Sequence, residues 1–124
     1  MIASLARPLF AFAVASTLAL FAGVGEASTF SAWQVAHVPW GDTLNVRAYP
    51  SARSRMQAAY PNGTRLQMTG RCTGGVDLFE IGRQPRSRQQ QTVRSVWCEV
   101  WHDPTRNGDF VTGWVHGRYI APLR

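Results

Sequence analysis

Short runs in which apolar and polar residues alternate make up most of the chain from about residue 33 onwards. In Leu44-Asn45-Val46-Arg47 the two apolar residues fall on one face and the two polar residues on the other. A period of two residues indicates a β-strand with one buried face. We therefore predict about five or six short strands, at residues 33–38, 44–47, 65–72, 96–102 and 110–116, with 118–120 closing the sheet.

The segments between these runs carry residues that favour turns. Tyr60-Pro61-Asn62-Gly63 predicts a tight turn, because proline presets φ and Asn-Gly tolerates the left-handed conformation. Arg106-Asn107-Gly108-Asp109 predicts a type I′ hairpin turn. We expect residues 48–59 to form a long irregular loop, and we find no segment long enough for a regular helix. The pattern indicates an all-β fold, a small barrel or sandwich.

The first 27 residues differ from this pattern. A single cation, Arg7, precedes an apolar run from Leu9 to Val24, and Gly25-Glu26-Ala27 places small residues at both positions that a signal peptidase reads. This layout predicts a secretory signal peptide over residues 1–27. The alternative is a retained membrane anchor, but the run is shorter than the roughly 20 residues that span a bilayer. We expect cleavage, no membrane span thereafter, and one exported domain over residues 28–124, periplasmic or secreted.

The two cysteines, Cys72 and Cys98, fit an oxidising compartment. Cys72 follows Leu66 and Met68 at even spacing, and Cys98 precedes Val100 by two residues, so both thiols point to the apolar faces of their strands. We predict a disulfide, which would contribute roughly 3 kcal/mol by closing a loop of about 25 residues. Two buried free thiols and a metal pair are the alternatives, and the sequence offers no histidine pattern that would complete a zinc site.

The charge is strongly positive and comes from arginine alone. Thirteen arginines and no lysine stand against seven acidic residues, for a net charge of +6. An anionic partner is one interpretation: envelope glycans, anionic lipid headgroups or the carboxylates of cell-wall peptides. A coding bias across the genome is the other, and both remain open. We expect no nucleic-acid partner, because an exported protein rarely meets nucleic acid.

No pattern indicates catalysis. Nucleophilic catalysis needs a serine or cysteine beside a base, and both cysteines are assigned to the disulfide. The three histidines, His37, His102 and His116, lie on separate segments without an acidic cluster. His116 shares a face with Trp114 and is either a surface histidine or a weak pH-sensitive contact. We therefore expect neither an enzyme nor a metal or cofactor site.

Several segments, in this order and spacing, resemble the bacterial SH3 (SH3b) domain, a small extracytoplasmic barrel often attached to cell-wall enzymes. The matching segments are Leu44-Asn45-Val46-Arg47 followed by Tyr49-Pro50-Ser51, the turn Pro61-Asn62-Gly63-Thr64, Trp97-Cys98-Glu99-Val100, and Thr112-Gly113-Trp114-Val115 ending in Arg118-Tyr119-Ile120. The resemblance covers about Trp33 to Leu123 and implies an SH3-like barrel.

The chain departs from this family in a polar insertion at about residues 73–95, where the n-Src loop would lie. The insertion contains the arginine- and glutamine-rich stretch 83–91, which we interpret as a loop in preference to a ligand clamp. The short apolar stretch Val76 to Ile81 is expected to dock the insertion onto the barrel.

The resemblance implies a non-catalytic role in recognition of cell-wall peptide or glycan. Aromatic residues would supply contact area and arginines would pair with carboxylates. The candidate ligand-binding residues are Arg47, Tyr49, Trp97, Trp101, Trp114, Arg118 and Tyr119, with Asn45 as a further polar contact. Trp114 is more readily interpreted as closing the barrel. The alternative function is an envelope protein-interaction or inhibitor subunit that uses the arginine-rich insertion, and we expect a monomer.

Overall fold

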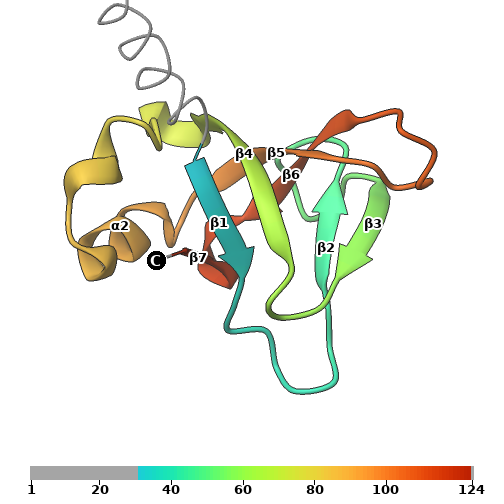
Figure 1. Cartoon of the computed structure of the whole chain (residues 1–124), viewed down its shortest axis with the longest axis horizontal. Helices are drawn as coiled ribbons and strands as arrows, with labels where there is room; N and C mark the ends of the chain where they lie inside the picture. Colours follow the sequence, from blue (N-terminus) through green and yellow to red (C-terminus); the bar gives the residue numbers. More distant parts are fainter. Residues whose placement is uncertain (1–30, 124) are drawn as a thin grey trace, which may run out of the picture.

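A computed structural model describes residues 31–123, and the predicted signal peptide lies outside the described residues. Within this range the strands are β1 (Ser31–Val35), β2 (Leu44–Arg47), β3 (Met56–Tyr60), β4 (Arg65–Cys72), β5 (Trp97–His102), β6 (Val111–His116) and β7 (Ile120–Pro122). They form one antiparallel sheet in the order β3-β2-β6-β5-β4-β1-β7 (Figure 1). The predicted all-β fold is confirmed, with seven strands where five or six were expected.

The core lies on the inner face of this sheet, as the alternation of residues requires. In β4 the buried side chains are those of Leu66, Met68 and Cys72, and in β5 they are those of Cys98, Val100 and His102. Trp33 and Val35 of β1 and Ile120 of β7 complete the same cluster. Each fully buried side chain of this size contributes about 1.5–3 kcal/mol to the free energy of unfolding. The burial of every second side chain therefore stabilises the sheet.

Two strands have the bounds that the sequence predicts, and one strand was not predicted. β2 and β4 coincide with their predicted ranges. β3, in contrast, forms from residues 56–59, expected to be irregular, and Tyr60, expected to begin a turn. This strand reads Met-Gln-Ala-Ala-Tyr, which has little of the β-branched and aromatic character of strands. It forms because it pairs with β2, with Leu44 opposite Tyr60 and Asn45 opposite Ala59.

The insertion is folded, which corrects two expectations. It contains the short 3-10 helices η3 (Thr73–Gly75) and η4 (Ile81–Arg83) and the α-helix α2 (Arg86–Val93), where we predicted a loop and no helix. Val93 is fully buried, and the backbone of α2 at this residue packs so closely on Gly117 that no Cβ would fit there. The predicted docking of the apolar stretch is confirmed, because Leu78 is buried and Leu78 N–H donates to the Gly70 carbonyl of β4 at 2.8 Å.

The β5–β6 connection also differs from its prediction. A type I′ turn at Asn107-Gly108 needs positive φ at both residues, but φ is positive at Arg106 (58°) and Gly108 (89°) and not at Asn107. The strands separate after the pair His102 and Val111, so the loop is longer than two residues. The Asp103 carboxylate accepts hydrogen bonds from the N–H groups of Asn107 (3.2 Å) and Gly108 (2.8 Å) and thereby fixes the loop.

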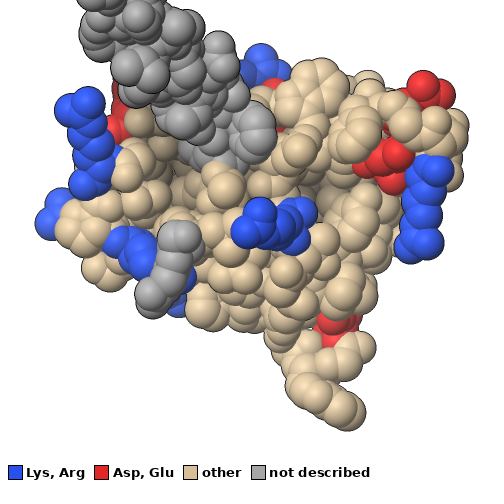
Figure 2. Space-filling model, in the orientation of Figure 1, with Lys and Arg blue, Asp and Glu red and all other residues tan. Residues whose placement is uncertain are grey.

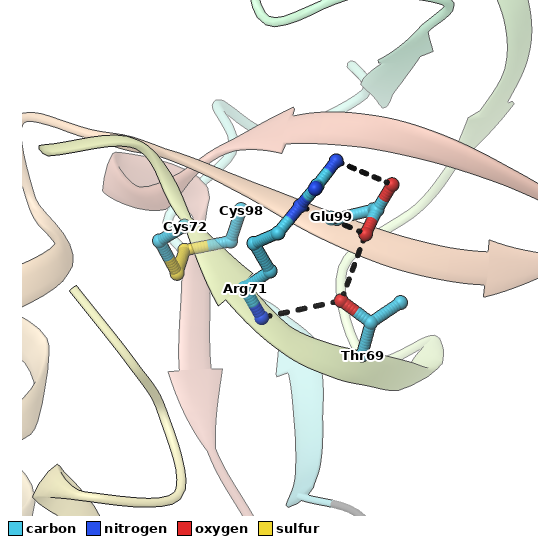
Figure 3. Close-up of polar contacts among 5 residues, drawn as sticks. All are labelled: Thr69, Arg71, Cys72, Cys98 and Glu99. Atoms are coloured by element: carbon cyan, nitrogen blue, oxygen red, sulfur yellow. Dashed lines mark hydrogen bonds and ion pairs between the residues drawn. A yellow bond between two sulfur atoms is a disulfide. The ribbon is translucent and has the colours of Figure 1, made fainter. Parts of the chain in front are cut away.

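The predicted disulfide between Cys72 and Cys98 is present. The two residues are opposite each other in the β4–β5 pairing, and the bridge spans the base of the insertion (Figure 3). Beside it, on the outer face, the Arg71 guanidinium lies 3.5 Å from a Glu99 carboxylate oxygen, and the Thr69 hydroxyl donates to the same carboxylate at 3.0 Å. Both contacts join β4 to β5.

Of the helices described here, none has the length and apolar character that a membrane crossing requires.

Candidate functional site

A groove of about 400 Å³ lies beside β2 and the segment 38–43 that precedes it. It is also lined by the start of β5, the end of β6 and the 3-10 helix η5 (Gly117–Tyr119) that follows β6. Four of the predicted ligand-binding residues, and Asn45 with them, line it together with residues from the loops. The lining side chains that carry its chemistry are Asp42, Asn45, Arg47, Trp97, His116, Arg118 and Tyr119. The sheet therefore brings together residues that are up to 77 positions apart in the chain.

Aromatic rings form one wall of the groove. Trp97 has the opposite phase to the buried Cys98, so its ring lies on the outer face, where it is directly opposite His116 of β6. The two rings meet edge to face with centroids 5.1 Å apart, and the His116 and Tyr119 centroids are 6.3 Å apart. Aromatic rings packed in this way supply a large contact area at small cost in side-chain entropy.

Charges of both signs border this wall. Arg47 is held in place because its Nη1 donates to the Ser54 carbonyl at 3.0 Å. Asp42 lies in the segment that leads into β2, and its Oδ1 accepts the Thr43 N–H at 2.8 Å, which orients the carboxylate. Arg118 also lines the groove. A ligand that carries both carboxylate and ammonium groups could therefore find partners here.

His116 is held in its neutral form and in one tautomer. Its Nδ1 accepts the backbone N–H of Arg118 at 3.2 Å, so the proton of the neutral ring is on Nε2. Burial lowers the pKa of His116, and the nearby Arg118 guanidinium lowers it further. At neutral pH the ring therefore offers one N–H donor to the groove and no positive charge.

Trp114 does not line this groove. Only 9% of its surface is exposed, although it lies on the outer side of β6 between Arg47 of β2 and Glu99 of β5. The Arg71 guanidinium covers the ring, 5.3 Å from its centroid, and Glu99 holds that guanidinium in position. A covered ring of this kind stabilises the packing of β6 between its neighbours. Trp114 is therefore buried on the outer face of the sheet, outside the core cluster, and its role in closing the barrel stays a prediction.

The other two predicted aromatic residues lie elsewhere. Tyr49 is 71% exposed, in the loop after β2, and it is absent from the lining of the groove. Trp101 is on the same strand and in the same phase as Trp97, but it lines a separate hollow of about 440 Å³ together with Tyr60 and Phe110. Trp97 and Trp101 therefore cannot serve one small binding site.

A charged residue of the groove and an exposed aromatic residue near it in the chain were not predicted from the sequence. Asp42 lines the groove, and Trp40, two positions earlier and outside the lining, is 99% exposed. The Asp42 N–H donates to the Pro39 carbonyl at 2.9 Å, and φ at Gly41 is 83°, so residues 39–42 form a tight turn that presents the indole to solvent. The Pro-Trp-Gly-Asp stretch carries this turn pattern, so the sequence did contain a signal for it.

Residues 31–123 contain no group of three histidine, cysteine, aspartate or glutamate side chains that could hold a metal ion. The family model described as bacterial SH3 domain matches residues 42–121, which is more than half of the chain and includes the insertion and most of the groove. No curated protein and no protein of solved structure matches the chain. Domains of this kind are generally non-catalytic binding modules, often of the cell wall, and often extracellular. A match of this extent places the chain in the bacterial SH3 domain family, with which the all-β fold is consistent.

Proposed function

We propose that this chain is an extracytoplasmic binding module that recognises a peptide of the cell wall through the groove at Trp97. The observation that carries the proposal is the pairing of an aromatic wall with side chains of both charges in one groove. The disulfide supports the extracytoplasmic location, because such bridges persist in oxidising compartments.

The chemistry of the groove favours peptide over glycan. The ring of Trp97 can contact either an apolar side chain or the face of a sugar. The Asp42 carboxylate, however, suits an ammonium group, and the guanidinium groups of Arg47 and Arg118 suit carboxylates. Cell-wall peptides carry both kinds of group, whereas a neutral glycan carries neither. Glycan binding remains the second ligand class within this proposal.

Binding of purified peptidoglycan sacculi, and titration calorimetry with a soluble disaccharide-tetrapeptide, test the proposal. Trp97→Ala is expected to reduce affinity by about tenfold or more, because a buried aromatic contact contributes on the order of 1.4 kcal/mol. Trp101→Ala is the matched control, since it removes the same side chain from the same face of β5 but outside the groove. Asp42→Asn removes the charge and keeps an oxygen that can accept the same hydrogen bond. It is expected to lower the affinity only for ligands with a free ammonium group.

If Trp97→Ala keeps full affinity and Trp101→Ala loses affinity, then the ligand binds in the hollow at Tyr60 and Phe110. Absence of any binding by the wild-type chain at low salt would refute the proposal. Thermal unfolding of each variant shows whether a loss of binding reflects a loss of fold.

A second function, contact with an envelope protein through the insertion, is favoured by the exposed arginines Arg83 and Arg88. The insertion cannot simply be deleted to test it, because Leu78 and Val93 belong to the core. The double variant Arg83→Gln/Arg88→Gln keeps the core and belongs in the same sacculus assay. Retained wall binding by this variant assigns wall recognition to the groove, and lost wall binding overturns that assignment. Chemical cross-linking to envelope proteins tests the second function: a product formed by the wild-type chain and absent for this variant supports it.

A further inference from the structure

A second hollow, of about 620 Å³, adjoins the groove, and the insertion forms one side of it. Arg118 and Tyr119 line both spaces, so the two are adjacent. In Figure 1, α2 lies beside β7 and β1, at the side of the sheet opposite β3. The polar residues that line this hollow are His37, Ser87, Gln90, Gln91, Arg94 and Arg118.

The hollow is basic and contains no acid. Its lining includes two guanidinium groups, of Arg94 and Arg118, and no aspartate or glutamate. Over residues 31–123 the one ion pair is Arg71–Glu99, on the outer face of β4 and β5, so neither guanidinium in the hollow has an ionic partner there. Figure 2 shows several basic side chains over the part of the surface that the insertion forms, at the left of the view. The positive charge at this hollow is therefore uncompensated within the described chain.

The backbone around the hollow is fixed before any ligand arrives. His37 has φ of 65°, in the left-handed region that few residues other than glycine adopt. On one side of it the Ala36 N–H donates to the Tyr119 carbonyl at 2.9 Å, and on the other Val38 exchanges two hydrogen bonds with the Asn62 amide. An unfavourable conformation held from both sides is typical of binding sites.

The helix of the insertion is fixed to the same point. The Gln90 side-chain amide donates to His37 Nε2 at 2.9 Å, which joins α2 to the segment that borders the groove. At the end of the helix Val93 is buried against Gly117, and Arg94, the next residue, lines the same hollow as Arg118. The site thus consists of groups from three segments in a defined arrangement.

We propose that this hollow binds a carboxylate of the ligand, so that the insertion extends the groove into a second, anion-binding subsite. A guanidinium group pairs with a carboxylate through two parallel hydrogen bonds, and the amides of Gln90 and Gln91 and the Ser87 hydroxyl can bond to the adjoining peptide group. The volume accommodates an amino-acid residue with its carboxylate, which is more than a small inorganic anion needs. The identity of the ligand as a peptide rests on the proposed function; the carboxylate site does not.

Titration of the purified chain with succinate, followed by amide chemical shifts in NMR, tests the subsite directly. Shifts are expected to be largest at Gln90, Arg94 and Gly117. Arg94→Gln is expected to weaken succinate binding by about three- to tenfold, the range for one partly exposed charge-assisted contact. Arg88→Gln is the matched control, because it makes the same change of charge on the helix that Arg94 follows, but outside the hollow.

Equal succinate affinity in Arg94→Gln and wild type would overturn the proposal, as would shifts that fall outside the hollow. A parallel titration with inorganic phosphate separates the possible anions: tighter binding of phosphate than of succinate overturns the assignment to a carboxylate. The disaccharide-tetrapeptide and its amidated form are then compared. If neither binds while succinate does, the proposed function fails and the anion site stands; if both bind with equal affinity, the anion site is not part of peptide recognition.

Discussion

Reduction of the Cys72–Cys98 disulfide is expected to destabilise this domain strongly. The bridge joins residues 26 positions apart and spans the whole insertion between β4 and β5. On the chain-entropy relation, opening a loop of this length removes about 3.5 kcal/mol of stability at 25 °C. Small domains have about 5–15 kcal/mol in total, so the loss is a quarter or more of the whole.

The expected change in melting temperature follows from this value. For a domain of this size, 1 kcal/mol corresponds to about 4–8 °C, so reduction should lower Tm by about 14–28 °C. Reduction is a better perturbation than mutation, because both sulfurs are buried and reduction leaves their packing atoms in place. A double replacement by alanine would add the cost of a cavity to the loss of the bridge.

Thermal unfolding followed by far-ultraviolet circular dichroism, with and without a phosphine reductant, measures the effect. Mass spectrometry after alkylation of the unfolded but unreduced chain counts the free thiols. If Tm is the same in both conditions, or if alkylation labels both cysteines without reductant, then the disulfide does not stabilise this domain and the reasoning is refuted.

Two further predictions concern the interior of the sheet. Gly113→Ala should cost about 1–3 kcal/mol in urea unfolding, because the new Cβ would lie 2.4 Å from Gln57 Oε1 and 2.5 Å from Val46 Cγ1. Gly82→Ala, where a Cβ meets nothing within 4 Å, should cost nothing, and equal losses would show that the close approach is unimportant. Burial lowers the pKa of His102, so the unfolded chain binds the proton more tightly and stability should fall as pH drops below about 6.5. His102→Gln should flatten this slope between pH 7 and 5, and an unchanged slope contradicts it.

The physical basis of the pH prediction lies in the bonds of the His102 ring. Its Nε2 donates to Gln57 Oε1 at 2.8 Å, and its Nδ1 therefore accepts the Tyr60 hydroxyl, also at 2.8 Å. A proton on Nδ1 would remove that acceptor and place a charge among buried strands. The same burial raises the pKa of the Tyr60 hydroxyl, so both groups are uncharged near neutral pH.

The alternation of residues was sufficient to predict β2 and β4 to the residue and to place Cys72 and Cys98 on the same buried side. It could not predict β3, whose side chains have weak strand preference and which depends on pairing with β2. Nor did it predict α2, a polar helix with a single fully buried residue, Val93. Its arginines and glutamines are good helix formers, but no apolar stripe accompanies them.

The sequence by itself determined which side chains point away from the core, because successive side chains of a strand point to opposite faces in any packing arrangement. The tertiary structure alone decided which of those side chains meet. Trp97 and Trp101 lie on the same face of β5, but the four-residue step between them spans about 13 Å. Trp97 therefore lines the groove, whereas Trp101 lines the separate hollow at Tyr60 and Phe110. Arg47, Trp97 and Arg118 are distant in the chain and come together because β2, β6 and β5 are neighbours in the sheet. Which strands are adjacent depends on the order of the strands in the sheet, and no local pattern of residues encodes that order.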